Sequence, residues 1–317
     1  MKSCPALNLL SRMLVTGILA ASSLSPANLL GASDEQRFSS SGDAIAALVA
    51  AARTKDTNAL QAIFGTEGGK LISPDVVQAA DELEMFVKRV SEKVDLATQS
   101  DLRSILQLGS DGWPFPIPLV REKDRWFFDT KEGAGEILNR RIGQNEIQTL
   151  QVCRAYVDAQ REYASSDRDG DGVLEYAQKL RSTEGKQDGL YWSYRENKER
   201  SPFGPLISES RAEGYRGNTK IMTDAPAPYH GYYFKILTKQ GRSALGGKYN
   251  YLVNGNMIGG FALVAWPAEW GNTGIMTFIV NQQGRIYQRN LGPGTSVTAA
   301  RMSSYDPDPK WHLLKDD

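Results

Sequence analysis

The clearest chemical pattern in this sequence is a set of three aspartates at alternate positions in an acidic loop. Asp167, Asp169 and Asp171 occupy positions one, three and five of the segment, and Gly172 follows at position six. Calcium-binding loops place carboxylate oxygens at positions one, three and five, and a glycine at six allows the sharp turn. The spacing therefore predicts a Ca²⁺ site at these three aspartates.

The rest of the loop follows the calcium pattern in part. Val173 at position seven would give its backbone carbonyl, and Glu175 at position nine would reach the ion directly or through water. Gln178 stands at position twelve in place of a bidentate glutamate, so we expect weak affinity, with a Kd of roughly 0.1 to 1 mM. The alternative is a solvated Asp-Gly turn, and the two differ in whether calcium raises the melting temperature.

A second group of candidate residues lies in the connection over residues 183–229, which is rich in Gly, Pro, Ser and charged residues. We expect it to be mostly irregular, and long irregular connections often carry function. Tyr191, Trp192 and Tyr194 would stack on a sugar or a peptide if their rings are exposed. The alternative is that these rings close over a core that the connection covers.

The sequence contains none of the common enzyme motifs that we searched for. It lacks a Gly-x-Ser-x-Gly elbow, a phosphate-binding loop, a His-Glu-x-x-His motif and a paired cysteine motif, and its histidines are His230 and His312. We therefore hypothesise a non-catalytic cell-envelope protein that binds or scaffolds an envelope protein or a glycan. The alternative is an envelope hydrolase that acts on a glycan or peptide through two loop carboxylates. The candidate carboxylates are Asp188, Glu209, Glu213 and Glu269.

Charge and the N-terminus restrict the partners and the location. Lys plus Arg and Asp plus Glu each number 37, and no basic stripe is present, so nucleic acid is not an expected partner. Lys2 and Arg12, then an apolar run over 13–24, then small residues up to Ala32 form the order of a secretory signal. We expect residues 1–32 to be a signal peptide, and the mature protein to be periplasmic or extracellular without a permanent membrane span.

The elements that position these candidates begin with a small α+β domain over residues 38–130. Apolar-periodic runs after capping residues predict helices, and short extended runs between turn residues predict strands, the last two of which form a hairpin. Pro114 and Pro116 remove ladder donors, so the strand that contains them should lie at an edge or begin only at Pro118. The expected helices are 44–53, 58–64 and 76–94, and the expected strands are 104–108, 115–121 and 125–128.

The acidic loop should lie between two helices. A helix over 131–141 leads, with at most a kink at Gly143, into a long amphipathic helix that starts near Gln144. Good helix formers at 173–180 predict a second helix after the loop. The apolar stripe expected to be buried is Ile147, Leu150, Cys153, Val157 and Ala164.

Two features of the long helix have both a structural and a catalytic interpretation. Cys153 lies on the apolar stripe, which favours a small buried hydrophobic residue over a nucleophile. Arg140, Arg141 and Glu146 lie near one another, and ion pairs that fix the helix to a sheet are favoured over a catalytic cluster.

From His230 the pattern alternates with period two, which is typical of strands. Gly-rich turns separate the runs, so we expect an antiparallel meander against which the long helix packs, in a domain over residues 131–317. The expected fold class is therefore α+β. The expected strands are 230–238, 249–253, 261–266, 275–280 and 285–289.

Several blocks resemble the bacterial domain-of-unknown-function family 2950, a family of exported proteins without an assigned chemistry. They are residues 113–119, 126–129, 137–146, 155–164, 188–192 and 259–271. This resemblance implies export and a shared fold. The C-terminal half, through residues 231–236, 261–267, 274–280 and 284–287, also resembles the headgroups of type IV pilins and pseudopilins, which implies one helix across an antiparallel meander. The N-terminal outline resembles cystatin-like or nuclear-transport-factor-like folds.

Overall fold

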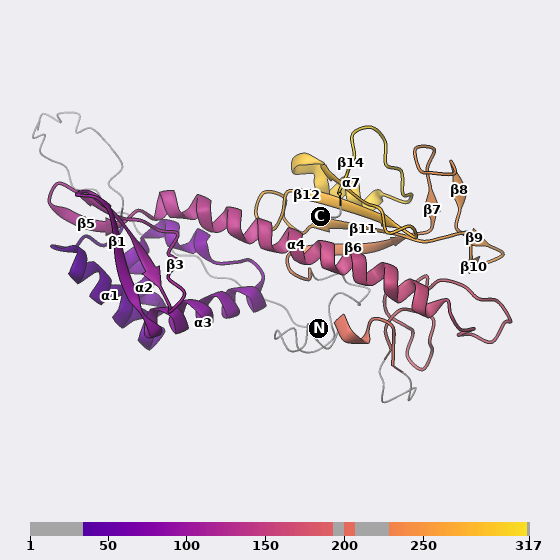
Figure 1. Cartoon of the computed structure of the whole chain (residues 1–317), viewed down its shortest axis with the longest axis horizontal. Helices are drawn as coiled ribbons and strands as arrows, with labels where there is room; N and C mark the ends of the chain where they lie inside the picture. The colour runs from indigo at the N-terminus through magenta and orange to yellow at the C-terminus, as the bar shows by residue number, and fades with distance from the viewer. Residues whose placement is uncertain (1–33, 193–199, 207–227, 316–317) are drawn as a thin grey trace, which may run out of the picture. The chain divides into compact units, whose positions relative to one another are not determined.

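The computed structural model describes residues 34–192, 200–206 and 228–315, and the predicted signal peptide lies outside them. The fold is α+β, as the sequence predicts (Figure 1). In the part of the chain that the structure describes, no helix has the length and apolar character that crossing a membrane requires. Its helices include α1 (Ser41–Thr54), α2 (Thr57–Phe64), η1 (Thr66–Leu71), α3 (Val76–Glu92), α4 (Thr130–Tyr163), η3 (Gly292–Gly294) and α7 (Thr295–Arg301).

The first three α-helices begin where short polar side chains cap them. Ser40 accepts a hydrogen bond from the Asp43 amide at 3.0 Å, and Asp56 accepts two from the first turn of α2. The sequence predicted both of these helices. Asp75 caps α3, and the Ser73 hydroxyl accepts from the Asp75 amide at 3.2 Å.

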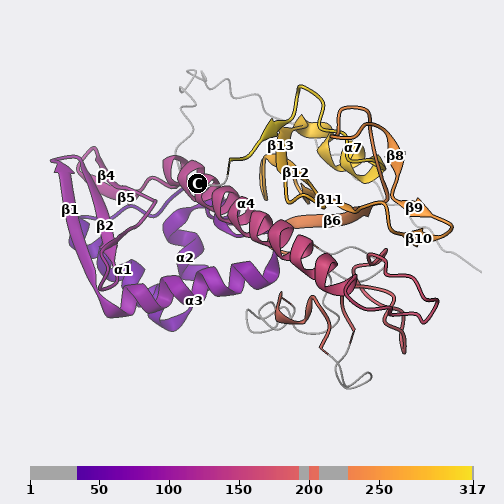
Figure 2. The same ribbon diagram turned by 45° about the vertical axis from the view of Figure 1, so that its right-hand side comes forward.

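The first sheet has the strand order β1-β2-β4-β5, with β3 paired to β2. Figure 2 shows this sheet beside α1, α2 and α3. The β4–β5 hairpin is confirmed. Strand β4 starts directly after Pro118, the last proline of this segment, because proline has no backbone N–H to donate to a neighbouring strand. The bounds are β1 (Val94–Ser100), β2 (Arg103–Leu108), β3 (Trp113–Pro114), β4 (Leu119–Glu122) and β5 (Arg125–Phe128).

The edge strand β1 was not predicted. The expected third helix ran to Val94, whereas α3 ends at Glu92 and Val94 opens a strand that pairs with β2 from Leu108 to Arg103. Most β1 side chains are exposed. Because an exposed edge strand needs no apolar alternation, its sequence carries no period-two signal.

The helix α4 is one continuous helix, so the predicted passage from 131–141 into the long helix is confirmed. Its buried face differs from the predicted stripe. Cys153 and Val157 are buried, but Ile147 is 54% exposed, and Leu150 and Ala164 are only partly buried. The buried face includes polar side chains that an apolar stripe leaves out. Its members in this half are Asn145, Thr149, Val152, Cys153, Tyr156, Val157, Ala159, Gln160 and Tyr163.

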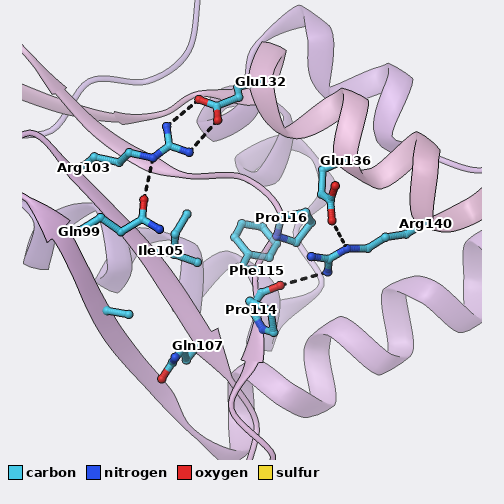
Figure 3. Close-up of a pocket in the computed structure, with 11 residues that line it drawn as sticks. Gln99, Arg103, Ile105, Gln107, Pro114, Phe115, Pro116, Glu132, Glu136 and Arg140 are labelled. Atoms are coloured by element: carbon cyan, nitrogen blue, oxygen red, sulfur yellow. Dashed lines mark hydrogen bonds and ion pairs between the residues drawn. The ribbon is translucent and has the colours of Figure 1, made fainter.

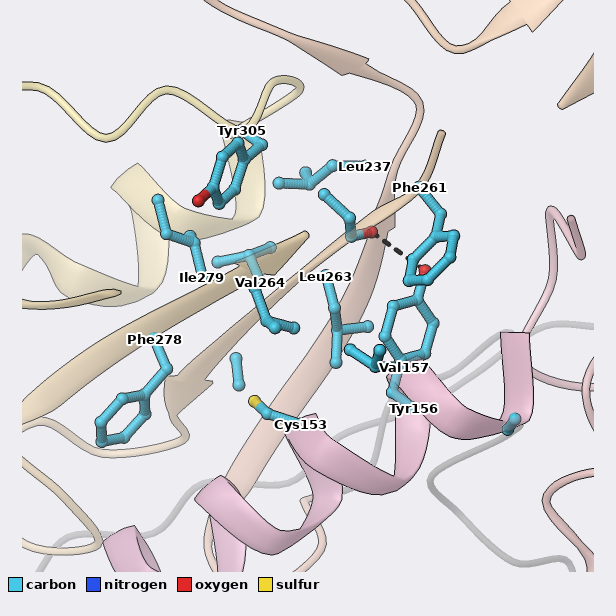
Figure 4. Packing of buried hydrophobic residues seen from close by; sticks show 14 of the residues in the cluster. Cys153, Tyr156, Val157, Leu237, Phe261, Leu263, Val264, Phe278, Ile279 and Tyr305 are labelled. Atoms are coloured by element: carbon cyan, nitrogen blue, oxygen red, sulfur yellow. Dashed lines mark hydrogen bonds between the residues drawn. The ribbon is translucent and has the colours of Figure 1, made fainter. Parts of the chain in front are cut away.

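The second sheet has the order β14-β13-β12-β11-β6 and is antiparallel throughout. Helix α4 contacts β11 and β12, and α7 also contacts β11, every residue of which is buried. Figure 4 shows Cys153, Tyr156 and Val157 of α4 beside the buried residues of this sheet. The bounds are β6 (Tyr232–Leu237), β11 (Ala262–Pro267), β12 (Met276–Asn281), β13 (Ile286–Asn290) and β14 (His312–Leu313).

The meander differs from the prediction between β6 and β11, which pair directly. The expected strand 249–253 is divided between two small antiparallel pairs, β7–β8 and β9–β10, and takes no part in the larger sheet. The helix α7 was not predicted. The additional strands are β7 (Lys239–Gln240), β8 (Tyr249–Asn250), β9 (Leu252–Val253) and β10 (Asn256–Met257).

The predicted helix at 173–180 is wrong. The amide of Tyr176 donates to the Met257 carbonyl at 2.9 Å, and the amide of Ala177 donates to the Gln160 side chain at 2.8 Å. The Leu190 amide donates to the Lys179 carbonyl. These partners satisfy the backbone from outside the segment, so tertiary contacts override its helix propensity.

Two buried hydrophobic clusters lie in the described part of the compact unit that spans residues 34–317. One cluster comes from the segment before α4 and includes Leu106 and Phe128. The other contains residues of the second half of α4 and of the second sheet. Ile137 of α4 packs against the first cluster and Cys153 belongs to the second, so one helix takes part in both cores.

Gly133, in the first turn of α4, supports a test of this packing. A Cβ at Gly133 would lie 2.6 Å from Cγ1 and 2.8 Å from Cα of Ile117. Because the close contact includes backbone, we expect Gly133→Ala to lower the free energy of unfolding by about 1 to 3 kcal/mol in chemical denaturation.

Gly135→Ala is the matched control on the same helix, since nothing lies within 4 Å of the corresponding Cβ position. Helix propensity should make this variant neutral or more stable by up to about 1 kcal/mol. Equal stabilities for the two variants would contradict the close approach of α4 to Ile117.

Candidate functional site

The acidic loop follows the end of α4 and brings the three predicted aspartates together. Asp167, Asp169 and Asp171 are exposed, and each offers a carboxylate oxygen within 4.8 Å of the others. Ligand oxygens of one Ca²⁺ each lie about 2.3 to 2.6 Å from the ion, so two of them are at most about 5 Å apart. The spacing of the three carboxylates therefore fits one calcium ion.

Backbone hydrogen bonds hold Asp167 in place. Its Oδ2 accepts from the Gly172 amide at 2.9 Å and its Oδ1 accepts from the Gly170 amide at 2.8 Å. These hydrogen bonds hold the pKa of the Asp167 carboxyl below its ordinary value, so it is ionised at neutral pH. Gly170 and Gly172 have φ values of 80° and 84°, in the left-handed region that glycine adopts without strain.

The loop is tied to the β9–β10 hairpin. Asp171 Oδ2 accepts from Asn256 Nδ2 at 2.7 Å, and Glu175 Oε2 accepts from the Met257 amide at 2.8 Å. Gln178, which stands where the calcium pattern has a bidentate glutamate, donates to a carbonyl of the same hairpin at 2.7 Å. The group of carboxylates close enough to share an ion contains the three aspartates without Glu175. Glu175 Oε2 supports the hairpin.

A groove lies between the first sheet and the start of α4, and the sequence reasoning did not find it (Figure 3). Its volume is about 430 Å³, within the usual range of small-molecule sites. Ile105 and Phe115 give it apolar surface. The remaining lining residues are Ala97, Gln99, Arg103, Gln107, Pro114, Pro116, Glu132, Glu136 and Arg140.

Two ion pairs cross or border this groove. Arg103 donates to both oxygens of Glu132, at 2.6 and 2.7 Å, and to the Gln99 amide oxygen at 2.8 Å. The Arg103 hydrogen bonds hold the pKa of the Glu132 carboxyl below its ordinary value. Arg140 donates to Glu136 at 2.7 Å.

The groove forms where one face of α4 lies opposite one face of β2. Glu132, Glu136 and Arg140 are four residues apart, so they lie on one face of α4. Arg103, Ile105 and Gln107 alternate along β2 and share one face of the sheet. The helical charge spacing is visible in the sequence, but nothing in the sequence alone places it opposite β2.

The comparison with protein families decides the assignment. A family model described as "Protein of unknown function (DUF2950)" matches residues 35–314. The chain belongs to this family. No curated protein and no solved structure matches it, so the likeness to pilin headgroups stays a prediction.

In this DUF2950 family member, two of the predicted stacking aromatics lie in the core. Tyr191 is 8% exposed and Trp192 is 4% exposed, and both belong to the second hydrophobic cluster. Arg168 covers the Trp192 ring at 5.2 Å from its centroid. Their burial fits the alternative of rings that close over a core and gives no exposed stacking surface. Tyr194 lies outside the described residues.

The carboxylates considered for hydrolysis do not form a described pair. Partial burial alone would raise the pKa of Asp188, but hydrogen bonds from Lys179 and Thr183 lower it. Glu269 accepts from Asn272 Nδ2 at 2.8 Å. Glu209 and Glu213 lie outside the described residues. Asp188 therefore has the contacts of a structural acid, since a general acid needs a raised pKa.

The polar residues in the middle of α4 fix the helix to its surroundings. Glu146 Oε1 accepts from the Ile275 and Met276 amides at 2.9 Å each, at the start of β12. Arg141 is 3% exposed and donates to the Leu71 carbonyl. These contacts agree with the predicted role of fixing the helix, although Glu146 acts through backbone hydrogen bonds.

Cys153 is fully buried, and burial raises the pKa of its thiol to about 12. A nucleophilic cysteine needs access and a lowered pKa. Cys153 is therefore a hydrophobic core residue, as the sequence predicted.

Proposed function

We propose that this protein is a non-catalytic component of the cell envelope with a binding or scaffolding role, and that its acidic loop binds Ca²⁺. The observation that carries the proposal is the grouping of the Asp167, Asp169 and Asp171 oxygens within 4.8 Å in a loop that also holds the β9–β10 hairpin. In this proposal the ion is structural, because it would stiffen the connection between α4 and that hairpin.

The calcium proposal has a simple electrostatic basis. Negatively charged groups this close repel one another, and a divalent cation among them converts the repulsion into attraction. The loop offers three carboxylates and lacks the bidentate glutamate, so its affinity should lie in the weak range of extracellular modules, roughly 0.1 to 1 mM. An exported protein would meet calcium at such concentrations.

The lowered pKa values of two candidate acids, Glu132 and Asp188, favour binding over catalysis at these two residues. Glu132 lines the groove, yet Arg103 lowers its pKa, and Lys179 and Thr183 lower that of Asp188. The alternative function, a carboxylate-dependent hydrolase, would need one acid with a raised pKa beside the substrate. Neither of these two acids meets that requirement.

Calcium should raise the melting temperature of the protein. With 10 mM Ca²⁺ and the expected affinity, linkage gives about 1.4 to 2.7 kcal/mol of added stability, which corresponds to a shift of several degrees. Asp169→Ala should abolish the shift. Asp101→Ala, which removes an exposed acid from the β1–β2 turn, is the matched control and should keep it. A thermal melt that does not respond to calcium would mean that the loop is only a solvated turn.

Export is tested separately. If residues 1–32 are a signal peptide, protein purified from its native host should begin near residue 33, because the apolar run and the small residues before it are removed on secretion. N-terminal sequencing measures this directly. A mature chain that begins at Met1 would contradict export by this route.

A further inference from the structure

The groove between β1, β2 and α4 has features of a ligand site that the calcium proposal does not use. The face of β2 that lines it is opposite the face that carries Leu106 and Leu108 into the first core. The β2 side chains of the groove are therefore not required to fill that core, whereas Phe115 belongs to both. Gln99, Gln107, Glu132 and Glu136 are all exposed.

The groove presents hydrogen-bond donors and acceptors side by side. Gln99 uses its amide oxygen to accept from Arg103, which leaves its amide nitrogen as a donor. The Gln107 side chain has no hydrogen-bond partner among the described residues, so it offers both a donor and an acceptor. Glu132 accepts two hydrogen bonds from Arg103, and a carboxylate has lone pairs for about two more.

The charges of the groove cancel. Its lining includes two arginines and two glutamates, and each arginine is paired with a glutamate. An anionic ligand would meet Glu132 and Glu136, and a cationic ligand would meet Arg103 and Arg140. In either case the ligand would have to compete with an ion pair that is already made, at a cost in binding free energy.

The apolar part of the groove is small and stiff. Ile105 and the Pro114–Pro116 segment lie between the polar residues of the strands and those of the helix (Figure 3). The Pro114 carbonyl accepts from Arg140 at 3.1 Å, which fixes the segment to α4. Proline has a restricted backbone, so little conformational entropy is lost when a ligand packs on it.

We propose that this groove binds a neutral, hydroxyl-rich ligand, namely a short stretch of an uncharged glycan chain. Each hydroxyl group donates and accepts, so neighbouring hydroxyls match the adjacent amide, guanidinium and carboxylate groups without altering either ion pair. The apolar strip takes the C–H face of the sugar ring. A volume of about 430 Å³ accommodates a small ligand of this kind.

This inference deepens the proposed binding role and rests on it, but it does not depend on calcium. The groove is built from the start of α4 and the first sheet, whereas the acidic loop follows the end of α4. Sugar titrations with and without calcium therefore separate the two proposals. If sugars fail to bind while calcium still raises the melting temperature, the groove inference is wrong and the calcium proposal stands.

The test is calorimetric titration of the folded protein with uncharged tetrasaccharides of glucose and of N-acetylglucosamine. Acidic oligogalacturonate and an unstructured neutral peptide are the comparison ligands. We expect the uncharged sugars to bind more tightly than either comparison ligand. Gln107→Ala should weaken binding about five- to tenfold, as expected for one lost hydrogen bond. Gln151→Ala, an exposed glutamine of α4 outside the groove, should have no effect.

A variant that blocks the groove tests the inference even if no single hydrogen bond contributes most of the sugar-binding free energy. Ala97 lines the groove on β1, so Ala97→Phe should fill it and abolish sugar binding. Thr98→Phe adds the same ring at the next, exposed position, whose side chain leaves the strand on the other face, and should leave binding unchanged. Sugar binding that survives Ala97→Phe, tighter binding of the acidic ligand or the peptide, or no sugar binding at all would overturn the inference.

Discussion

The buried side chain of Asn145 makes the contact on which the rest of the structure depends. Its Oδ1 accepts from Gln78 Nε2 of α3 at 3.1 Å, and its Nδ2 donates to the Thr273 carbonyl, just before β12, at 2.9 Å. The residue is fully buried. A buried amide that lost either partner would keep an unsatisfied polar group, at a cost of about 1 to 3 kcal/mol. One side chain of α4 thus fixes the helix both to α3, which packs on the first core, and to the segment before β12, which belongs to the second sheet.

This constraint explains how one helix positions two candidate sites. Glu132 and Arg140, near its start, face the groove, and Gln160, near its end, holds the segment after the acidic loop through both amide atoms on Ala177, each at 2.8 Å. Because Asn145 lies between them and fixes the helix on two sides, neither end can shift without breaking buried hydrogen bonds. The groove and the loop therefore belong to a preorganised scaffold.

The sequence predicts those features whose physical cause is local. Capping side chains, helix propensity and glycine-rich turns indicate α1, α2, α4 and the main strands, and alternate aspartates indicate the loop. It fails where distant partners decide. Gln160 and Met257 hold residues 173–180 out of a helix, and buried Asn145 and Thr149 rotate the inner face of α4 away from Ile147. The groove needs a strand and a helix to meet, which periodicity alone does not reveal.

Native-state hydrogen exchange of the parent and of Asn145→Ala tests most directly whether this clamp joins the two cores. In the parent, the slowest amides of β2 and β11 should open with one shared free energy, because both cores unfold together. Asn145→Ala should lower protection in both strands by about 1 to 3 kcal/mol, whereas Asn139→Ala, an exposed asparagine of the same helix, should leave it unchanged. Separate opening energies for β2 and β11 in the parent, or equal effects of the two variants, would contradict the account.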